Sequence, residues 1–230
     1  FPPPPAEPAS EAVSLWKRAD AVCFDVDSTV CVDEGIDELA AWLGRGAQVA
    51  EWTARAMDGG VTFQEALAAR LGIIEPSREA VESYVARNPP RLAPGARALV
   101  SALHARGTDV YLVSGGFTQM INPVADALGV PRSNVYANTI LFDGATGEYA
   151  GFDEEAYTSR SGGKPAAIRA IRAARGYGAV VMVGDGVTDL EARLEGAAEL
   201  FVGYGGVHQR EAVRRGADWF VTDFKQLTEE

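Results

Sequence analysis

FDVDSTV, residues 24–30, is the stretch that decides the fold and the chemistry expected of this chain. It continues the apolar run AVC of residues 21–23, so an apolar strand ends in two carboxylates. Side chains alternate along a strand with a period of two, and Asp25 and Asp27 therefore start out pointing the same way. Two acids placed like this favour a hard divalent cation, with one carboxylate free to attack phosphorus.

Taken alone, two acids in a turn are better explained by a solvated turn with an N-cap, but three further segments reverse that preference. The run VYLVSGG at 110–116 ends in a hydroxyl and two glycines. SGGK at 161–164 is a glycine-rich turn that delivers a lysine at the start of a helical segment. VVMVGDGVTD at 180–189 is another apolar strand that ends in acids. Together they predict a phosphate site with a metal.

The order of apolar runs and helical segments predicts the fold class. Strands are expected at residues 21–25, 109–113, 179–183 and 199–202, separated by helices at 94–106, 117–128, 165–175 and 188–194. Continuous apolar runs that alternate with amphipathic helices indicate an α/β fold, a doubly wound parallel sheet covered on both faces. Ligands of such sheets bind beyond the carboxyl ends of the strands, which brings Asp25, Ser114 and Asp185 together.

Residues 35–90 show helices without strands and predict a small helical cap inserted after the first strand. The sequence TFQE at 62–65 reads as a capping box that opens a helix, and Pro76-Ser77 starts another that Asn88 stops. Residues 134–142 and 148–152 are expected to pair as a β-hairpin. The expected domains are a proline-rich lead-in at 1–18, an α/β core at 19–34 and 91–230, and the cap at 35–90.

The bulk properties exclude several classes of protein. A chain of 230 residues fits one α/β domain with a small insertion. Its net charge of −11 argues against binding to nucleic acid or to an anionic membrane surface. No apolar run approaches the roughly 20 residues that span a bilayer. The chain begins at Phe1 with prolines at 2–5 and 8, which favours a mobile tail, such as the remnant of a processed transit peptide.

The order acid, hydroxyl, lysine, acid pair resembles the haloacid dehalogenase superfamily of phosphotransferases, and within it the phosphoserine phosphatase family. The resemblance covers nearly everything from residue 19 to residue 227. It extends to DEGIDEL at 33–39, RAM at 55–57, YAGFDE at 149–154 and TDF at 222–224. Three segments are similar to sequences of the plant and algal branch: VCVDE at 30–34, EWTAR at 51–55 and TSRS at 158–161.

The resemblance implies catalytic roles for five residues. Asp25 is the expected nucleophile, which forms an aspartyl-phosphate. Asp27 is the expected general acid and base, and its backbone carbonyl is expected to bind the metal. Lys164 is expected to neutralise the transferring phosphoryl group and to hold the nucleophile anionic. Asp185 and Asp189 are expected to complete, with Asp25 and Asp27, a site for one Mg²⁺ per chain, because carboxylate and carbonyl oxygens select that ion.

The substrate site is implied in the same way. Phosphate oxygens are expected to bind Ser114, Gly115 and Gly116, next to the positive end of the following helix. The resemblance implies that Glu34 binds the ammonium group of an amino acid and that Arg70 binds its carboxylate. It also implies substrate contacts for Ser28, Met57, Phe63 and Thr188. Two positions depart from the family pattern: Asp58, beside the substrate, replaces the usual glycine, and Thr62 replaces a proline.

The expected activity is Mg²⁺-dependent hydrolysis of O-phospho-L-serine, the last step of serine synthesis, by a monomer or a homodimer. The expected location is the chloroplast stroma or the cytoplasm. A related phosphatase with another small phosphomonoester as substrate is the first alternative. A signalling receiver module, in which an aspartate accepts phosphate without turnover of a metabolite, is the second. The acid on the first strand and the helical insertion argue against the second alternative.

Overall fold

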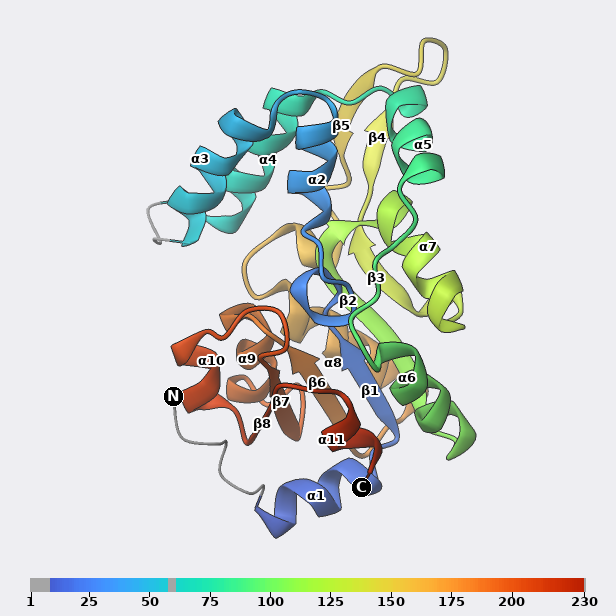
Figure 1. Ribbon diagram of the computed structural model, residues 1–230, viewed down its shortest axis with the longest axis vertical. Coiled ribbons are helices and arrows are strands. Elements are labelled where there is room, and N and C mark those ends of the chain that lie inside the picture. Colours follow the sequence, from blue (N-terminus) through green and yellow to red (C-terminus); the bar gives the residue numbers. More distant parts are fainter. Residues whose placement is uncertain (1–8, 58–60, 230) are drawn as a thin grey trace.

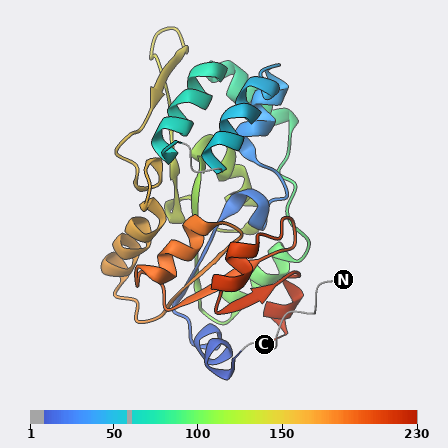
Figure 2. The same cartoon turned by 90° about the vertical axis from the view of Figure 1, so that its left-hand side faces the viewer.

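The fold was taken from a computed structural model, which describes residues 9–57 and 61–229, the side chains of Ala56 and Met57 excepted. The molecule has two stacked parts, an α/β sheet with its helices and a smaller group of helices with a β-hairpin (Figure 1). The view from the side shows the same division, with the blue-to-teal helices above the orange and red ones (Figure 2). None of the helices among these residues is long and apolar enough to cross a membrane.

The larger part is built on a six-stranded sheet in the order β3-β2-β1-β6-β7-β8. Every neighbouring pair in this sheet is parallel, which confirms the expected α/β class. The central strand is the acid-bearing one, and its Phe24 lies in register with Leu112 of β2 and Val183 of β6. The strands are β1 Ala21–Phe24, β2 Asp109–Phe117, β3 Val135–Asn138, β6 Val180–Gly184, β7 Leu200–Tyr204 and β8 Trp219–Val221.

Helices cover both faces of this sheet because alternate side chains of each strand point to opposite faces. Val22 and Phe24 of β1 join the core under α1, α6, α7 and α11, whereas Ala21 and Cys23 join the core under α8, α9 and α10. The helices are α1 Ser10–Lys17, α6 Ala96–Ala105, α7 Thr118–Leu128, α8 Gly163–Arg175, α9 Val187–Leu194, α10 Glu211–Gly216 and α11 Lys225–Thr228. Short 3₁₀ turns span Arg132–Asn134 and Tyr157–Ser159.

The smaller part follows β1 and a tight turn at Val26–Val30. It holds α2 Gly35–Trp42, α3 Gly46–Met57, α4 Phe63–Ile74 and α5 Arg78–Arg87. The expected capping box is present: Thr62 caps the Glu65 N–H and the Glu65 carboxylate accepts from Thr62. Ser77 caps α5, and Asn88 ends it. The predicted starts of α4 and α5 and the predicted end of α5 were therefore correct, whereas α4 was expected to end at Leu71 and continues to Ile74.

The expected β-hairpin was wrong in one arm. Residues 134–142 form two strands: β3 joins the large sheet parallel to β2, and β4 Ile140–Phe142 pairs antiparallel with β5 Tyr149–Phe152. The break follows from the fully buried Asn138, whose side chain donates to the Gly115 carbonyl at 2.8 Å and accepts from Thr158 at 3.0 Å. A local apolar pattern indicates a strand but not its partner.

Two other strand expectations need correction. β2 was expected to end at Val113, but it continues through Phe117, so Ser114 and the two glycines lie within the strand. β8 was not expected at all, because a strand of only three residues carries little periodicity of its own. The hairpin β4–β5 packs against the helices of the smaller part, where Ile140 shares a buried cluster with Leu67 and Leu71 of α4.

Candidate active site

A cavity of about 540 Å³ opens at the carboxyl ends of β1, β2 and β6, between the sheet and α4. This is the edge where a parallel sheet binds its ligands. Eleven residues expected in the site line it: Asp25, Asp27, Glu34, Phe63, Arg70, Ser114, Gly115, Gly116, Lys164, Asp185 and Thr188. The cavity therefore brings together segments that are far apart in the sequence.

The turn after β1 places its two aspartates differently. Asp25 is buried, and its side chain accepts a hydrogen bond from the Val26 N–H at 2.8 Å. Ser28 closes the turn with φ +53°, a left-handed conformation that is rare for a residue with a Cβ. The Ser28 hydroxyl is fully buried and donates to Glu34 Oε1 at 2.7 Å. The turn thus points Asp25 and Asp27 into the cavity and fixes Glu34.

Three buried aspartates form a candidate metal centre. Carboxylate oxygens of Asp25, Asp185 and Asp189 lie within 4.8 Å of one another. Lys164 reaches Asp25 Oδ1 at 2.9 Å and Asp189 Oδ1 at 2.5 Å, and Arg210 Nε lies 3.0 Å from Asp185 Oδ2. Three hard oxygen donors with a formal negative charge left over suit a divalent cation such as Mg²⁺.

The ionisation of this cluster reflects burial and repulsion. Burial, followed by the charge of Asp25, raises the pKa of Asp189 to about 7 and raises that of Asp185. Burial disfavours the charged form of Lys164, but attraction to Asp189 and Asp25 outweighs it and raises the pKa of the ammonium group. The lysine therefore stays positively charged. The three carboxylates carry more negative charge than Lys164 and Arg210 neutralise, so a further cation would be favoured here.

Asp27 stands apart from the three clustered carboxylates. Its Oδ1 accepts a hydrogen bond from the Gly35 N–H at 3.0 Å, at the start of α2. Burial raises its pKa to about 8, with further repulsion from Glu34 and Asp25. A Cβ on Gly116 would lie 3.2 Å from Asp27 Oδ2, so the glycine leaves room for this carboxyl. Asp27 can hold a proton near neutral pH, which a general acid requires.

The β2 end forms a cradle for an anion. Ser114 is buried and its hydroxyl accepts from the Gly116 N–H at 3.0 Å. The helix α7 begins at Thr118, directly after these residues, so its positive end faces the same region. On the other side, a Cβ on Gly163 would overlap the Tyr157 carbonyl, so only glycine permits the turn that delivers Lys164. The cradle and the lysine line one cavity.

The smaller part contributes an acid, a base and an aromatic ring. Glu34 precedes α2, and burial raises the pKa of its carboxyl. Arg70 projects from α4, where its Nε donates to the Ala66 carbonyl at 3.2 Å and burial lowers its pKa. Phe63 covers the sheet end: a Cβ on Gly115 would lie 3.0 Å from its Cζ. Opposite charges beside an anion cradle can bind the two ends of an amino acid.

Some expected site residues do not line the cavity. Ser28 and Asp189 are fully buried beneath it and act on Glu34 and Lys164. Asp58 and the side chain of Met57 lie outside the described residues. Sequence reasoning missed Ile36, Thr53, Leu67, Arg210 and Glu211, all of which line the cavity. Arg210 could have been predicted from the sequence, because it follows β7 and the carboxyl end of β7 lies at the same edge of the sheet.

Known proteins resemble the chain closely. A family model for haloacid dehalogenase-like hydrolases matches residues 19–195. The chloroplastic phosphoserine phosphatase of Arabidopsis thaliana is 59% identical, over 96% of this chain and 74% of that protein. The phosphoserine phosphatase of Bos taurus is 48% identical, over 95% of this chain and 96% of that protein. A solved phospho-aspartyl intermediate analogue of phosphoserine phosphatase covers 92% of this chain and 98% of its own, with a TM-score of 0.77 and 25% identity.

Proposed function

Because the chain belongs to the phosphoserine phosphatase family of the haloacid dehalogenase-like hydrolases, we infer that it hydrolyses O-phospho-L-serine to L-serine and phosphate. In this role it performs the last step of serine synthesis. The observation that carries the proposal is the cavity itself. Lys164 and the aspartates stand beside an anion cradle, while Glu34 and Arg70 line the part toward the helices. A phosphate ester of a small amino acid matches both sets of groups.

In the first half of the proposed reaction, a carboxylate oxygen of Asp25 attacks phosphorus. A bond forms between that oxygen and phosphorus, and the bond from phosphorus to the serine oxygen breaks. The Asp27 carboxyl gives its proton to the leaving oxygen, so L-serine departs as the neutral alcohol. Lys164, at 2.9 Å from Asp25, keeps the nucleophile anionic and offsets charge on the phosphoryl oxygens.

In the second half, water attacks the phosphorus of the aspartyl-phosphate. Asp27, now a carboxylate, takes a proton from that water. The bond between Asp25 and phosphorus breaks, which releases inorganic phosphate and restores both aspartates. Ser114, Gly115 and Gly116 are assigned to the phosphoryl oxygens in both steps, since they line the same cavity at the start of α7.

We propose Mg²⁺ as the resident metal. Asp25, Asp185 and Asp189 would hold it through carboxylate oxygens, together with the Asp27 carbonyl, as the family resemblance implies. When bound, Mg²⁺ supplies positive charge that draws electrons from the phosphate oxygens. The excess of carboxylates over Lys164 and Arg210 supports this choice of site.

At the amino-acid end, we assign the substrate ammonium to Glu34 and the carboxylate to Arg70. Ser28 holds Glu34 in place, and the Arg70 guanidinium keeps free donors beyond its bond to Ala66. Phe63 and Thr188, which line the same cavity, complete the surroundings of the substrate in this proposal.

Steady-state phosphate release from a panel of esters tests the function. Phosphoserine should turn over many times per enzyme, faster than phosphothreonine and other small phosphomonoesters, and only with Mg²⁺ present. A higher kcat/KM for another ester would favour the alternative of a related phosphatase with a different substrate. A single turnover that stops at the phosphorylated protein would instead favour a receiver module.

Two further proposals concern the cell. We propose the chloroplast stroma as the location, supported by the Arabidopsis relative described as chloroplastic, with the cytoplasm as the alternative. Fractionation of the source cells distinguishes these. We propose a monomer or a homodimer that needs neither nucleic acid nor membrane, and sedimentation equilibrium with purified protein gives the state directly.

A further inference from the structure

Two opposite charges at the amino-acid end of the site do not pair with each other. Glu34 and Arg70 both line the cavity of the candidate active site, which we call the catalytic cavity, and the charge of Glu34 acts on the pKa of Arg70. Among the ion pairs of residues 9–57 and 61–229, none joins these two side chains. If they did pair, an amino acid would have to break that pair before it could bind.

Asp37 is a third charged side chain near this end. It lies in the first turn of α2, one turn after Glu34. Burial lowers the pKa of Arg70, and the charge of Asp37 opposes this more strongly than the charge of Glu34 does. Burial raises the pKa of Glu34, and repulsion from Asp37 contributes to the increase. Asp37 is therefore close to both groups, and it attracts the guanidinium more strongly than Glu34 does.

Thr53 of α3 holds the Asp37 carboxylate. Its hydroxyl donates to Asp37 Oδ1 at 3.2 Å, and the Val49 carbonyl at 3.3 Å is its second acceptor. Thr53 lines the catalytic cavity, whereas Asp37 lies outside the lining. The carboxylate is thus tied to a second helix behind the cavity wall, where it attracts Arg70 without occupying the place of the substrate.

The two partners of the amino acid have further contacts that suit this arrangement. Arg70 Nε donates to the Ala66 carbonyl at 3.2 Å, which leaves the other N–H groups of the guanidinium for carboxylates. Glu34 Oε1 accepts from the Ser28 hydroxyl at 2.7 Å. Because a guanidinium is a planar fork with donors on more than one edge, Asp37 and a substrate carboxylate can share it.

We propose that Asp37, held by Thr53, is a positioning residue for the amino-acid end of the substrate. It draws the Arg70 guanidinium away from Glu34, so that the carboxylate and the ammonium group of the substrate each meet a free partner. This inference rests on the proposed hydrolysis of phosphoserine and adds to it a residue outside the cavity lining.

Four phosphate esters separate the roles of the charged groups. Phosphoserine carries both the ammonium and the carboxylate, O-phosphoethanolamine only the ammonium, 3-phosphonooxypropanoate only the carboxylate, and 4-nitrophenyl phosphate neither. Asp37→Asn should raise KM for the first three about fivefold, as expected for one partly screened charge pair, and should leave kcat within about twofold. Neither constant should change for 4-nitrophenyl phosphate.

O-Phosphoethanolamine gives a result that a structural role of Asp37 would not produce. Without the charge of Asp37, Arg70 should pair with Glu34 and compete with the substrate ammonium. Arg70→Ala should then free Glu34 and lower KM about fivefold in the Asp37→Asn background. In the wild-type background, where Arg70 is already held away, Arg70→Ala should change this KM less than about twofold, so the two substitutions are coupled.

Thr53 provides a second test of the same contact. Thr53→Val removes the hydroxyl at nearly constant shape and should raise KM for phosphoserine about two- to fivefold, as expected for one hydrogen bond. Thr53→Ser keeps the hydroxyl and should match the wild type. In the Asp37→Asn background, Thr53→Val should add nothing, because the hydroxyl acts through Asp37.

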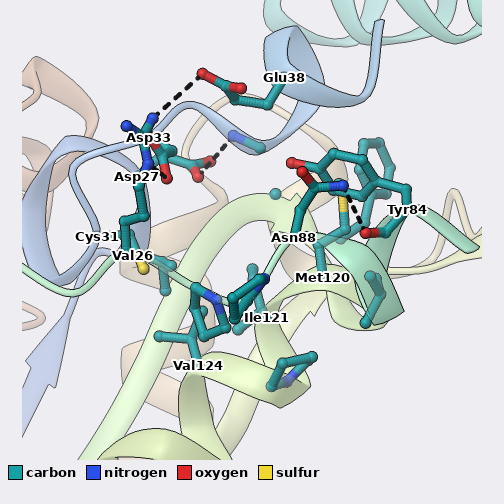
Figure 3. Close-up of a pocket in the computed structure, with 18 of the residues that line it drawn as sticks. Val26, Asp27, Cys31, Asp33, Glu38, Tyr84, Asn88, Met120, Ile121 and Val124 are labelled. Atoms are coloured by element: carbon teal, nitrogen blue, oxygen red, sulfur yellow. Dashed lines mark hydrogen bonds and ion pairs between the residues drawn. The ribbon is translucent and has the colours of Figure 1, made fainter. Parts of the chain in front are cut away.

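Glu38, the next residue on α2, is the matched control. Figure 3 shows it at a second cavity together with Asp33 and Tyr84, and it lies 3.6 Å from Arg91. Glu38→Gln removes one charge from the same helix, but outside the lining of the catalytic cavity. The kinetics with phosphoserine should therefore stay those of the wild type.

Three results would overturn the inference: an unchanged KM for phosphoserine in Asp37→Asn, an equal change with 4-nitrophenyl phosphate, or no recovery when Arg70 is removed. Binding gives an answer without turnover. In the Asp25→Asn background, calorimetry should find phosphoserine bound about fivefold more weakly when Asp37 is also replaced by Asn. If the wild type releases no phosphate from phosphoserine, the proposed function fails. If it does and Asp37→Asn behaves like the wild type, only this inference fails.

Discussion

Two aspartates only two residues apart occupy different electrostatic surroundings. Asp25 lies 2.9 Å from the Lys164 ammonium and accepts a hydrogen bond from the Val26 N–H at 2.8 Å. Asp27 meets Glu34 and Asp25, and burial with these charges raises its pKa to about 8. A carboxyl that keeps its proton near neutral pH suits the role of general acid, which leaves Asp25, beside Lys164, as the nucleophile.

The first prediction concerns the pH dependence of turnover. The raised pKa of Asp27 keeps it protonated below about pH 8, and the leaving serine needs that proton. With phosphoserine, kcat should therefore fall as the pH rises through about 8. With 4-nitrophenyl phosphate, whose leaving group departs as an anion, the alkaline decline should be absent. Asp27→Asn should lower kcat for phosphoserine about 10²–10⁴-fold. An equal decline with both esters would assign the titration to another group.

The second prediction concerns the nucleophile. Asp25→Asn should abolish turnover with the fold retained, because an amide cannot supply the attacking anion. Mass spectrometry of acid-quenched wild-type protein should find phosphate on Asp25. Phosphate on Asp27 or Asp185, or activity in the variant, would contradict the assignment. Circular dichroism of the variant serves as the control for folding.

The third prediction separates recognition from chemistry. Glu34→Gln and Arg70→Ala should each lower kcat/KM for phosphoserine. The expected loss of transition-state stabilisation is roughly 1.5–3 kcal/mol, the contribution of a hydrogen bond to a charged group. Activity on 4-nitrophenyl phosphate should change little, because that ester lacks an amino-acid end. Glu51→Gln and Arg45→Ala, exposed in the same part of the molecule, are the matched controls. Equal losses on both esters would give these residues a structural role.

At the scale of elements, helix α4 positions the substrate end of the site. It carries Phe63 at its first residue and Arg70 two turns later, and it begins at the Thr62 capping box. The Glu65 N–H donates to Thr62 Oγ1 at 3.3 Å, and the Thr62 N–H donates to Glu65 Oε2 at 2.8 Å. Ser161, just before α8, donates to Gln64 at 3.3 Å and ties α4 to the lysine-bearing turn.

The fourth prediction follows from that cap. Thr62→Ala removes the side-chain acceptor at the start of α4 and should destabilise the protein by about 1 kcal/mol. For a domain of this size the melting temperature should fall by roughly 2–4 °C, measured by calorimetry. Thr62→Ser keeps the hydroxyl and should melt close to the wild type. If the alanine and serine variants melt together, the cap does not stabilise α4.

At the scale of the whole molecule, a chain of net charge −11 must bind an anionic substrate. The site does so with positive charge concentrated at one sheet edge, where Lys164 and Arg210 face the substrate cavity. Three buried carboxylates remain close together there, and the raised pKa values of Asp185 and Asp189 show that their charge is disfavoured. A bound cation should therefore stabilise the fold as well as support the reaction.

The fifth prediction tests the metal by activity and stability. Chelation with EDTA should abolish activity, Mg²⁺ should restore it, and Ca²⁺ should restore little, because Ca²⁺ prefers more ligands and looser geometry. At 100 times its dissociation constant, Mg²⁺ should add about 2.7 kcal/mol of stability, or roughly 5–10 °C in melting temperature. Asp185→Asn should lose this shift, whereas Glu155→Gln, on the exposed surface, should keep it. Full activity after chelation would exclude the metal site.

The chain pattern alone determined the parallel sheet, the helical insertion and the residues at the strand ends. The apolar runs before Asp25, Ser114 and Asp185 indicate buried strands locally, and a parallel sheet brings the carboxyl ends of its strands to one edge. The capping box at Thr62 was equally local, since both of its partners lie within four residues. Features that depend on neighbours in sequence could therefore be predicted.

Only the tertiary structure decided the features that depend on distant partners. It assigned β3 to the large sheet and β4 to the hairpin, although both lie in one apolar stretch. It placed Asp189 beneath the cavity, bonded to Lys164, and it brought Arg210 to Asp185. Strand pairing, burial and cavity shape arise from contacts between segments that are not neighbours in sequence, such as Val113 with Tyr136 and Asp185 with Arg210, and no local pattern carries that information.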